Sequence, residues 1–429
     1  MDKIRILGGE SLSGSVKIEG AKNAVLPIFA ATMLCDSPSV IRNVPPLSDV
    51  KTMLEILRSL GADCQFDEAN REVTIDPCGI HSVVASYDMV RKMRASICVL
   101  GPLIGRFGKA RVSFPGGCVI GQRPVDLHIK GLRALNVDIK ITEGYIEATA
   151  DHLRGSSVFL GGRFGSSVLA TANIMLAAVK ADGVTVIESA ACEPEIVDLA
   201  NILKKMGAEI SGAGTHSIRI KGVDKLVGVD YSVIPDRIEA GTFILAAAIT
   251  RSCIEIENVV RNHLLVLIDN LLEVGIKITG GDNRLKVDAR FNNLSSLDIT
   301  TLPYPGFPTD LQAQMMAFLT TVSGISVITE KIFSERFMHI AELNRMSADI
   351  SLEKSIAIVK GGTPLSGAPV MASDLRASAA LVLAGLVADG VTVISRIYHL
   401  DRGYYKMEEK LQSLGANIER LSEEALQYV

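Results

Sequence analysis

A glycine-rich segment at residues 114–126, FPGGCVIGQRPVD, places one cysteine where it could do chemistry. A proline and two glycines precede Cys118 and favour a loop, so its thiol should be accessible. Arg123 follows closely, and a nearby cation lowers the pKa of a thiol and makes it reactive. The setting therefore favours a functional Cys118. The commoner role of an isolated cysteine is buried packing, which we expect for Cys35, Cys98 and Cys253.

Polar residues precede the apolar, alanine-rich segments of the chain. In chain order they are Lys22–Asn23, Arg94, Ser166–Ser167, Asp236–Arg237, Thr309–Asp310 and Asp374–Arg376. The apolar segments predict buried helices, and the start of a helix attracts anions through its free N–H groups and dipole. We interpret Ser166 and Asp236 as helix N-caps. Cations are disfavoured at a helix start unless an anion compensates. Lys22, Arg94 and Arg376 therefore indicate a site for a ligand rich in phosphate and carboxylate.

Six internal repeats supply the elements that must position these residues. Six similar segments, such as LRSLGADC at 58–65 and LKKMGAEI at 203–210, each predict a helix that a residue tolerant of left-handed geometry ends, followed by a strand. These helix-ending residues are Gly61, Asn136, Gly207, Gly275, Ser347 and Gly415. In one helix we expect Ser48 to be the N-cap, and in another Pro194 to lie in the first turn.

The repeats and the length of the chain predict two domains. Single hydrophobic cores stop growing at roughly 250–300 residues, and this chain has 429. Six units divide into two sets of three, with the segment 231–241 as the crossing between lobes. The first opening strand precedes Lys22, so the N-terminal piece is expected to join the second lobe.

The composition narrows the function classes. The formal net charge is −4, so we expect no nucleic-acid partner, and any field that attracts an anionic substrate must be local. Seven cysteines without a C-x-x-C pair indicate a reducing compartment. We see no signal peptide at residues 1–10 and no apolar stretch long enough to span a bilayer. We therefore expect a cytoplasmic protein without a membrane partner, a metal or a cofactor.

The motifs together resemble those of the UDP-N-acetylglucosamine enolpyruvyl transferases, within the enolpyruvyl transferase family. The resemblance extends nearly end to end. It rests on GAKNAVLP (20–27), RKMRAS (91–96), PGGCVIGQRPVDLH (115–128), PDRIEAGTF (235–243), PGFPTDLQAQ (305–314), SERFMH (334–339), SDLRAS (373–378) and DRGY (401–404). It implies two inside-out α/β lobes, each of three repeated β-α-β-α-β-β units, joined by a double crossover. One lobe would comprise 22–234 with the cysteine loop, and the other 1–21 plus 235–429.

The resemblance also implies a reaction: enolpyruvyl transfer from phosphoenolpyruvate to the 3-hydroxyl of UDP-N-acetylglucosamine, with release of phosphate. This is the first committed step of peptidoglycan synthesis, so the implied context is cell wall biogenesis, cell shape, the cell cycle and cell division. Fosfomycin is the thiol-alkylating inhibitor of the family. Cys118 would be the acid that protonates a carbon of phosphoenolpyruvate, and Asp310 the base for the sugar hydroxyl.

Individual residues match family positions. Lys22, Arg94, Arg123, Arg376 and Arg402 match residues that contact phosphoenolpyruvate or the shared site, and Asn23 matches one between the substrates. The stretch Arg123, Pro124, Val125, Asp126 and Leu127 matches the uridine-binding segment, Ser166, Ser167 and Val168 match a diphosphate-binding loop, and Ile332 matches a backbone contact to the sugar nucleotide. Arg336 matches an arginine that supports closure, and we add Asp374 as a substrate-binding candidate beside Arg376.

One position departs from the family pattern. Where many members have glycine, this chain has Leu169, and a leucine does not let a ligand approach the backbone as closely. We therefore expect the diphosphate contact to be displaced toward Gly165. Two alternatives stay open: transfer of enolpyruvyl to shikimate 3-phosphate, whose enzymes lack a PGGC loop of this kind, and a non-catalytic paralogue that only binds a UDP-sugar.

Overall fold

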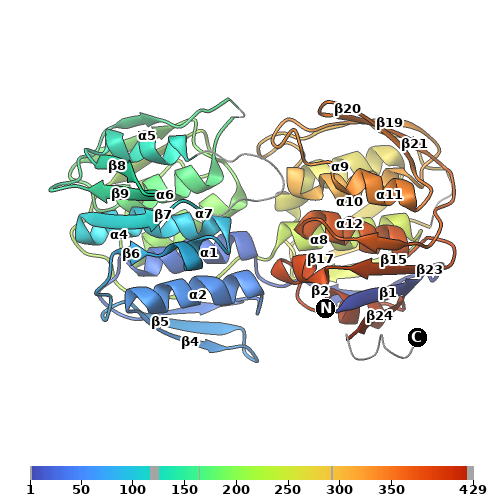
Figure 1. The fold of residues 1–429 in the computed structure, drawn as a ribbon, viewed down its shortest axis with the longest axis horizontal. Helices are drawn as coiled ribbons and strands as arrows, with labels where there is room; N and C mark the ends of the chain where they lie inside the picture. The colour runs from blue at the N-terminus through green and yellow to red at the C-terminus, as the bar shows by residue number, and fades with distance from the viewer. Residues whose placement is uncertain (1, 116–124, 164, 291–292, 423–429) are drawn as a thin grey trace. The chain divides into compact units, whose positions relative to one another are not determined.

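The structure is a computed structural model that describes residues 2–115, 125–163, 165–290 and 293–422. These residues form two compact units, coloured along the chain in Figure 1. The first unit contains residues 20–115 and 125–234, and the second contains residues 2–19 and 235–422. The N-terminal segment therefore packs with the C-terminal half of the chain.

Six four-stranded sheets form within the described residues, three in each unit, and all follow one plan. In the first unit they are β14(Asp230–Ser232)-β3(Ser39–Arg42)-β5(Glu72–Asp76)-β4(Asp63–Asp67), β6(Val84–Ala85)-β7(Lys109–Ser113)-β9(Tyr145–Thr149)-β8(Asp138–Thr142) and β10(Ser157–Phe159)-β11(Val184–Glu188)-β13(Ser217–Lys221)-β12(Glu209–Ser211). In the second unit they are β2(Ser13–Lys17)-β15(Cys253–Glu257)-β17(Arg284–Asp288)-β16(Lys277–Gly281), β18(Ile299–Thr300)-β19(Gly324–Thr329)-β21(Ile356–Gly361)-β20(Asp349–Glu353) and β22(Pro369–Met371)-β23(Val391–Ser395)-β1(Lys3–Leu7)-β24(Asn417–Leu421).

Each sheet joins one parallel pair to an antiparallel run. In the sheet that ends the chain, β22 and β23 are parallel, and β1 from the N-terminus lies between β23 and β24, antiparallel to both. Ile4 faces Ile394 and Arg420 in register. The strand from the start of the chain thus fills the place that a hairpin strand takes in the other sheets.

Central helices form the core of each unit. In the first unit they are α1(Lys22–Thr32), η1(Arg94–Val99) with α4(Leu100–Phe107), and α6(Val168–Ala178); in the second they are α8(Arg237–Ile249), η3(Thr309–Leu311) with α10(Gln312–Leu319), and α12(Leu375–Gly385). In α8 every residue from Ile238 to Ile249 is buried. A helix that is apolar on every side has to be buried, which explains their central position. The predicted inside-out α/β fold with three repeated units per lobe is confirmed.

Outer helices complete the repeats. They are α2(Ser48–Leu60), α5(Asp126–Ala134), α7(Pro194–Met206), α9(Leu265–Val274), α11(His339–Arg345) and α13(Met407–Ser413), with short helices α3(Tyr87–Val90), η2(Arg261–Leu264) and η4(Ile397–Arg402). All six predicted helix-ending residues have positive φ, from 69° at Asn136 to 115° at Gly207. Pro194 lies in the first turn of α7, as predicted. The cap expected at Ser48 was wrong, because α2 begins at Ser48 and no side chain caps it. Among the described residues, we find no helix with the length and apolarity needed to cross a membrane.

Candidate active site

Three predicted residues of the second unit, Asp310, Arg336 and Arg376, lie together. Asp310 lies in η3, just before α10, and each of its carboxylate oxygens accepts a hydrogen bond from an arginine. Arg336 Nη1 lies 2.8 Å from Oδ1, and Arg376 Nη2 lies 3.1 Å from Oδ2. Both arginine side chains are nearly inaccessible, whereas 27 % of the Asp310 side chain is exposed. The three residues form one buried cluster that opens to solvent at the carboxylate.

The electrostatics of this cluster bear on the basicity of Asp310. Burial alone would raise the pKa of Asp310, but the charges and hydrogen bonds of Arg376 and Arg336 outweigh burial and hold it far below its ordinary value. A carboxylate in this state is a weak base. Asp310 can take a proton from a hydroxyl only if one of its arginines turns toward another anion.

Arg376 has donors to spare. Its Nε and Nη1 atoms are buried and make no hydrogen bond of good geometry to any residue that the structure describes. Its guanidinium lies 5.4 Å from the centroid of the Tyr404 ring, which fixes one face of the group. A buried cation with unused donors is costly, so this position suits an anionic ligand.

N-caps occupy three of the central helix starts. Asp236 accepts from the backbone N–H groups of Ile238 and Glu239, which confirms its predicted capping role. The cap of α6 is Ser167, which accepts from Ala170 N at 3.3 Å, so the cap assigned to Ser166 was off by one residue.

Asp374 caps α12. One of its oxygens accepts from the N–H groups of Arg376 and Ala377 at 2.8 and 3.1 Å. The side chain is buried. The structural role of Asp374 is therefore to cap α12, and a substrate contact by Asp374 remains a prediction.

Two central helix starts in the first unit have no side-chain cap. Lys22 begins α1 and is buried, with its ammonium 2.6 Å from a carboxylate oxygen of Asp49. Asn23, the next residue, is exposed. Arg94 begins η1 and is half-buried. The structure therefore places both cations where the sequence predicted them.

The predicted sugar-nucleotide segments of the first unit lie at the starts of α5 and α6. Val125 is buried, Asp126 opens α5 and is exposed, and Leu127 is half-buried. Ser166 and Val168 are half-buried on either side of the α6 cap. Cys118, Arg123 and Pro124 lie outside the described residues.

His128 supports this region and was not singled out by sequence reasoning. It is buried, and its Nδ1 lies 2.9 Å from Asn173 Nδ2. Burial, together with the charge of Arg94, lowers its pKa to about 3, so the imidazole is neutral. Asn173 also binds Ile97 O and Gly101 N, which ties α5, α6 and α4 together.

The remaining predicted residues are positioned by loops of the second unit. Arg402 is the last residue of η4 and is half-buried. Its neighbour Asp401 binds Arg420 on β24. Ile332 follows β19, and its N–H donates to Glu330 at 2.8 Å. Glu330 is buried and was missed by the sequence analysis. A lone glutamate after an apolar strand gives no signal of its own.

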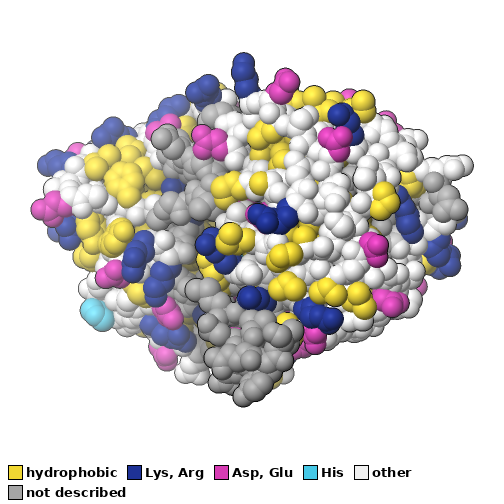
Figure 2. All heavy atoms as spheres, turned by 45° about the vertical axis from the view of Figure 1, so that its right-hand side comes forward, with side chains coloured by type: hydrophobic (Ala, Val, Ile, Leu, Met, Phe, Trp, Pro, Cys, Tyr) yellow, Lys and Arg dark blue, Asp and Glu magenta, His cyan; other side chains and the backbone are white. Residues whose placement is uncertain are grey.

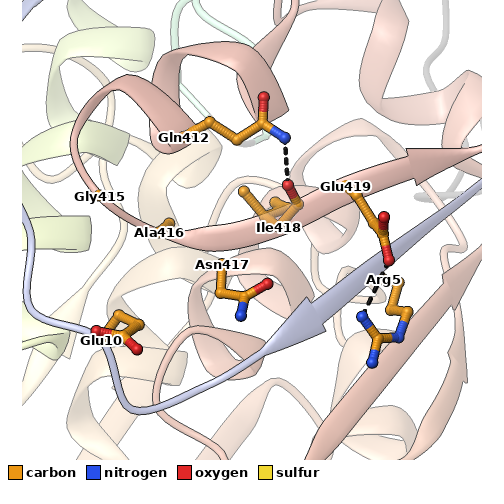
Figure 3. Close-up of a pocket in the computed structure, with 8 residues that line it drawn as sticks. All are labelled: Arg5, Glu10, Gln412, Gly415, Ala416, Asn417, Ile418 and Glu419. Atoms are coloured by element: carbon orange, nitrogen blue, oxygen red, sulfur yellow. Dashed lines mark hydrogen bonds and ion pairs between the residues drawn. The ribbon is translucent and has the colours of Figure 1, made fainter.

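Other surfaces offer weaker candidates. A hollow of about 610 Å³ near the C-terminal strand has polar walls, but Gln412 donates to Ile418 O and Arg5 pairs with Glu419 at 2.9 Å (Figure 3). The charges of Arg5 and Glu419 are therefore already partnered. On the face drawn in Figure 2, Lys and Arg side chains of the described residues are interspersed with Asp and Glu.

Comparison with known proteins gives consistent results. Residues 6–411 match the family of EPSP synthase (3-phosphoshikimate 1-carboxyvinyltransferase). A UDP-N-acetylglucosamine 1-carboxyvinyltransferase from Coxiella burnetii (strain Dugway 5J108-111) is 53 % identical over 423 residues, with 98 % of this chain and 96 % of the relative covered. UDP-N-acetylglucosamine 1-carboxyvinyltransferase 2 from Carboxydothermus hydrogenoformans is 55 % identical over 424 residues, covering 99 % and 100 % of the two chains.

Solved structures support the same architecture. The enolpyruvyl transferase NikO from Streptomyces tendae superposes with a TM-score of 0.88 at 25 % identity, and the match covers 98 % of each chain. An EPSP synthase from Acinetobacter baumannii has a TM-score of 0.75 at 19 % identity, covering 98 % of this chain and 100 % of the other, and shows a shared fold.

Proposed function

Since this chain belongs to the UDP-N-acetylglucosamine 1-carboxyvinyltransferases of the EPSP synthase family, we propose that it transfers the enolpyruvyl group of phosphoenolpyruvate to the 3-hydroxyl of UDP-N-acetylglucosamine. The observation that carries this proposal beyond the similarity is the cluster of Asp310, Arg336 and Arg376. It combines a carboxylate that can receive a proton with a buried cation that still has free donors.

The anionic groups of phosphoenolpyruvate bind to cations in this proposal. Arg376 directs its unused N–H groups at the phosphate or the carboxylate, which a planar guanidinium matches well. Lys22, Arg94, Arg123 and Arg402 supply further positive charge. The two units act as the two lobes of the enzyme, joined by the crossings near residues 20 and 235.

The reaction begins with addition. The 3-hydroxyl oxygen of the sugar forms a bond to C2 of phosphoenolpyruvate while its proton passes to Asp310, and Cys118 donates a proton to C3. The tetrahedral adduct then returns a proton from C3 to the Cys118 thiolate as its C2–O bond to phosphate breaks, and inorganic phosphate leaves with the proton that Asp310 had taken. When Arg376 turns from Asp310 to the substrate anions, it restores part of the basicity of the carboxylate and stabilises the departing phosphate, while Arg336 keeps its bond to Asp310.

The sugar nucleotide occupies the first unit and the loop after β19. Residues 123–127 hold the uridine, Ser166, Ser167 and Val168 hold the diphosphate, and the backbone of Ile332 contacts the sugar. Asn23 lies between the two substrates, and Arg336 supports closure. Leu169 displaces the diphosphate toward Gly165, whose φ of +94° is accessible to glycine without strain.

The experiment follows phosphate release by the purified protein given both substrates. Wild type should release phosphate and fosfomycin should stop it. Cys118→Asp replaces the thiol by a carboxylic acid, which can still donate a proton but is not the alkylated group, so the variant should stay active and resist the drug. Full activity of Cys118→Ala would refute the acid assignment. Shikimate 3-phosphate replacing the sugar nucleotide as acceptor would favour the sister activity, and tight sugar-nucleotide binding without turnover would favour a non-catalytic paralogue.

The cellular role follows from the reaction. We propose that the enzyme works in the cytoplasm at the first committed step of peptidoglycan synthesis, and so contributes to cell wall biogenesis, cell shape and division. It needs no cofactor, metal, membrane or nucleic-acid partner in this proposal.

A further inference from the structure

Glu330 is a buried carboxylate whose two oxygens serve different parts of the site. It follows β19 and is 1 % exposed. Oε1 accepts from the Thr301 hydroxyl at 2.7 Å and from the N–H groups of Ile332 and Phe333 at 2.8 and 2.9 Å. Thr301 in turn accepts from Lys331 N at 3.0 Å. This oxygen therefore fixes the main chain of residues 331–333.

The other oxygen leads to the Asp310 cluster. Oε2 accepts from the Thr309 hydroxyl at 2.8 Å, and Thr309 Oγ1 accepts from Arg336 Nη1 at 3.1 Å. The same Nη1 donates to Asp310 Oδ1 at 2.8 Å. The path from Glu330 to Asp310 is thus a continuous series of hydrogen bonds within the second unit.

The charge on Glu330 sets the direction of these bonds. A threonine hydroxyl has one proton, and an ionised carboxylate can only accept. Because Thr309 gives its proton to Glu330, its lone pairs face Arg336, which can only donate. A neutral amide at position 330 would let the hydroxyl turn, and the orientation of the guanidinium would no longer be fixed.

Packing alone does not account for the carboxylate. Glu330 makes no ion pair with any residue in the described part of the chain, and a buried carboxylate without a cation is costly unless hydrogen bonds compensate. Here four donors do so: two hydroxyls and two backbone N–H groups. The whole network of Glu330, Asp310, Arg336 and Arg376 balances two negative and two positive charges.

We propose that Glu330 is a positioning residue with two separate effects. Through Thr301 and the backbone it shapes the chain at Ile332, and through Thr309 it orients Arg336 toward Asp310. The assignment of Ile332 to the sugar nucleotide and of Asp310 to proton transfer rests on the proposed function. The geometric part of the inference does not.

The two effects can be separated with one substitution each. Thr309→Val removes the link to Arg336 and leaves the loop bonds of Glu330 intact. We expect kcat to fall about 10–100-fold, the equivalent of one charge-assisted hydrogen bond, with a nearly unchanged KM for UDP-N-acetylglucosamine. Thr301→Val weakens the loop and should raise that KM about 10-fold with a nearly unchanged kcat. Glu330→Gln should show both effects.

Two controls accompany these variants. Thr309→Ser keeps the hydroxyl and should restore kcat to within about threefold of wild type. Thr300→Val changes an exposed threonine on β18, next to Thr301, and should leave both constants unchanged. Thermal unfolding checks that each variant is folded. If the valine variant does not fold, Thr309→Ala removes the same hydroxyl with a smaller side chain.

Equal kcat values for Thr309→Val and Thr309→Ser would overturn the inference, as would parallel changes of kcat and KM in the two valine variants. A crystal structure of Thr309→Val settles the geometric part without any assay. Arg336 still bound to Asp310 in its original orientation would contradict the proposed path. An inactive wild type would instead count against the proposed function and leave this structural result standing.

Discussion

Replacing Asp310 by asparagine tests the central cluster through stability as well as activity. Asparagine keeps the shape and one acceptor oxygen, but it removes the negative charge that two buried arginines share. Breaking a buried pair by neutralising one partner costs ~3–5 kcal/mol because the other charge stays buried. Since 27 % of the Asp310 side chain is exposed, solvent screens part of this loss, and we expect ~2–3 kcal/mol.

The assay is thermal unfolding with a matched control. At ~2–4 °C per kcal/mol for a unit of this size, Asp310→Asn should lower Tm by ~4–12 °C at pH 7. Asp349 pairs with Lys360 at 3.5 Å on the surface, with both side chains more than half exposed. Asp349→Asn should therefore leave Tm unchanged. Added inorganic phosphate, as a replacement anion for Arg376, should protect the Asp310 variant more than wild type.

The pH dependence gives a second check with a fixed sign. The pKa of Asp310 is lowered in the folded protein, so its contribution to stability is complete above its unfolded pKa of about 3.9 and is lost as the pH falls below that value. The Tm difference between wild type and Asp310→Asn should shrink below about pH 4. Equal Tm values for the two asparagine variants at pH 7, or a difference that does not change with pH, would refute this account of the cluster.

Three further predictions use other buried groups. Lys22→Met should abolish phosphate release and destabilise the protein by ~3–5 kcal/mol because the buried Asp49 carboxylate loses its ion pair with the Lys22 ammonium. Adding Asp49→Leu should restore Tm but not activity, and recovered turnover would count against Lys22 as a substrate contact. Burial raises the pKa of Asp198 to about 6, so wild type should lose up to ~3 kcal/mol of stability as the pH rises from 4 to 6. Urea unfolding measures this loss, and parallel curves of unfolding free energy against pH for wild type and Asp198→Asn would contradict it. Ser167→Ala should lower stability by ~0.5–1 kcal/mol through loss of the α6 cap, whereas Ser166→Ala should have no effect; the reverse order would contradict the cap assignment.

The repeated architecture could be predicted from the sequence because its signals are local. A glycine, asparagine or serine at the end of a predicted helix indicates that its own backbone has a positive φ. All six such residues have the expected left-handed backbone. Helices that are apolar on every side can only be central. The register of β1 between β23 and β24 was not predictable in this way, because it joins the two ends of the chain and no local pattern encodes it. The cap at Ser48 failed because serine is also tolerated within the first turn.

The candidate site was predictable where a residue type is unfavourable for the helix position that it occupies. Lys22 and Arg376 stood out because cations are poor residues for a helix start. The partners of those cations were not predictable from spacing, since Arg376 meets Asp310 from a different repeat. Glu330 was missed for the same reason: its role is visible only when the four donors around it are placed in space.

The central helix starts are of two kinds, those with a side-chain cap and those without one. α6, α8 and α12 begin with Ser167, Asp236 and Asp374, whose side chains already occupy free N–H groups. The starts of α1, η1 and η3 have no side-chain cap. Two of these three begin with a buried or half-buried cation, Lys22 or Arg94. A capped helix start is satisfied by the protein itself, whereas an uncapped one beside a cation gains most from an external anion. The side chain at the helix start thus decides whether the free N–H groups are satisfied within the protein, whereas a cation beside a capped start, such as Arg376 on α12, has to bind an anion through its own side chain.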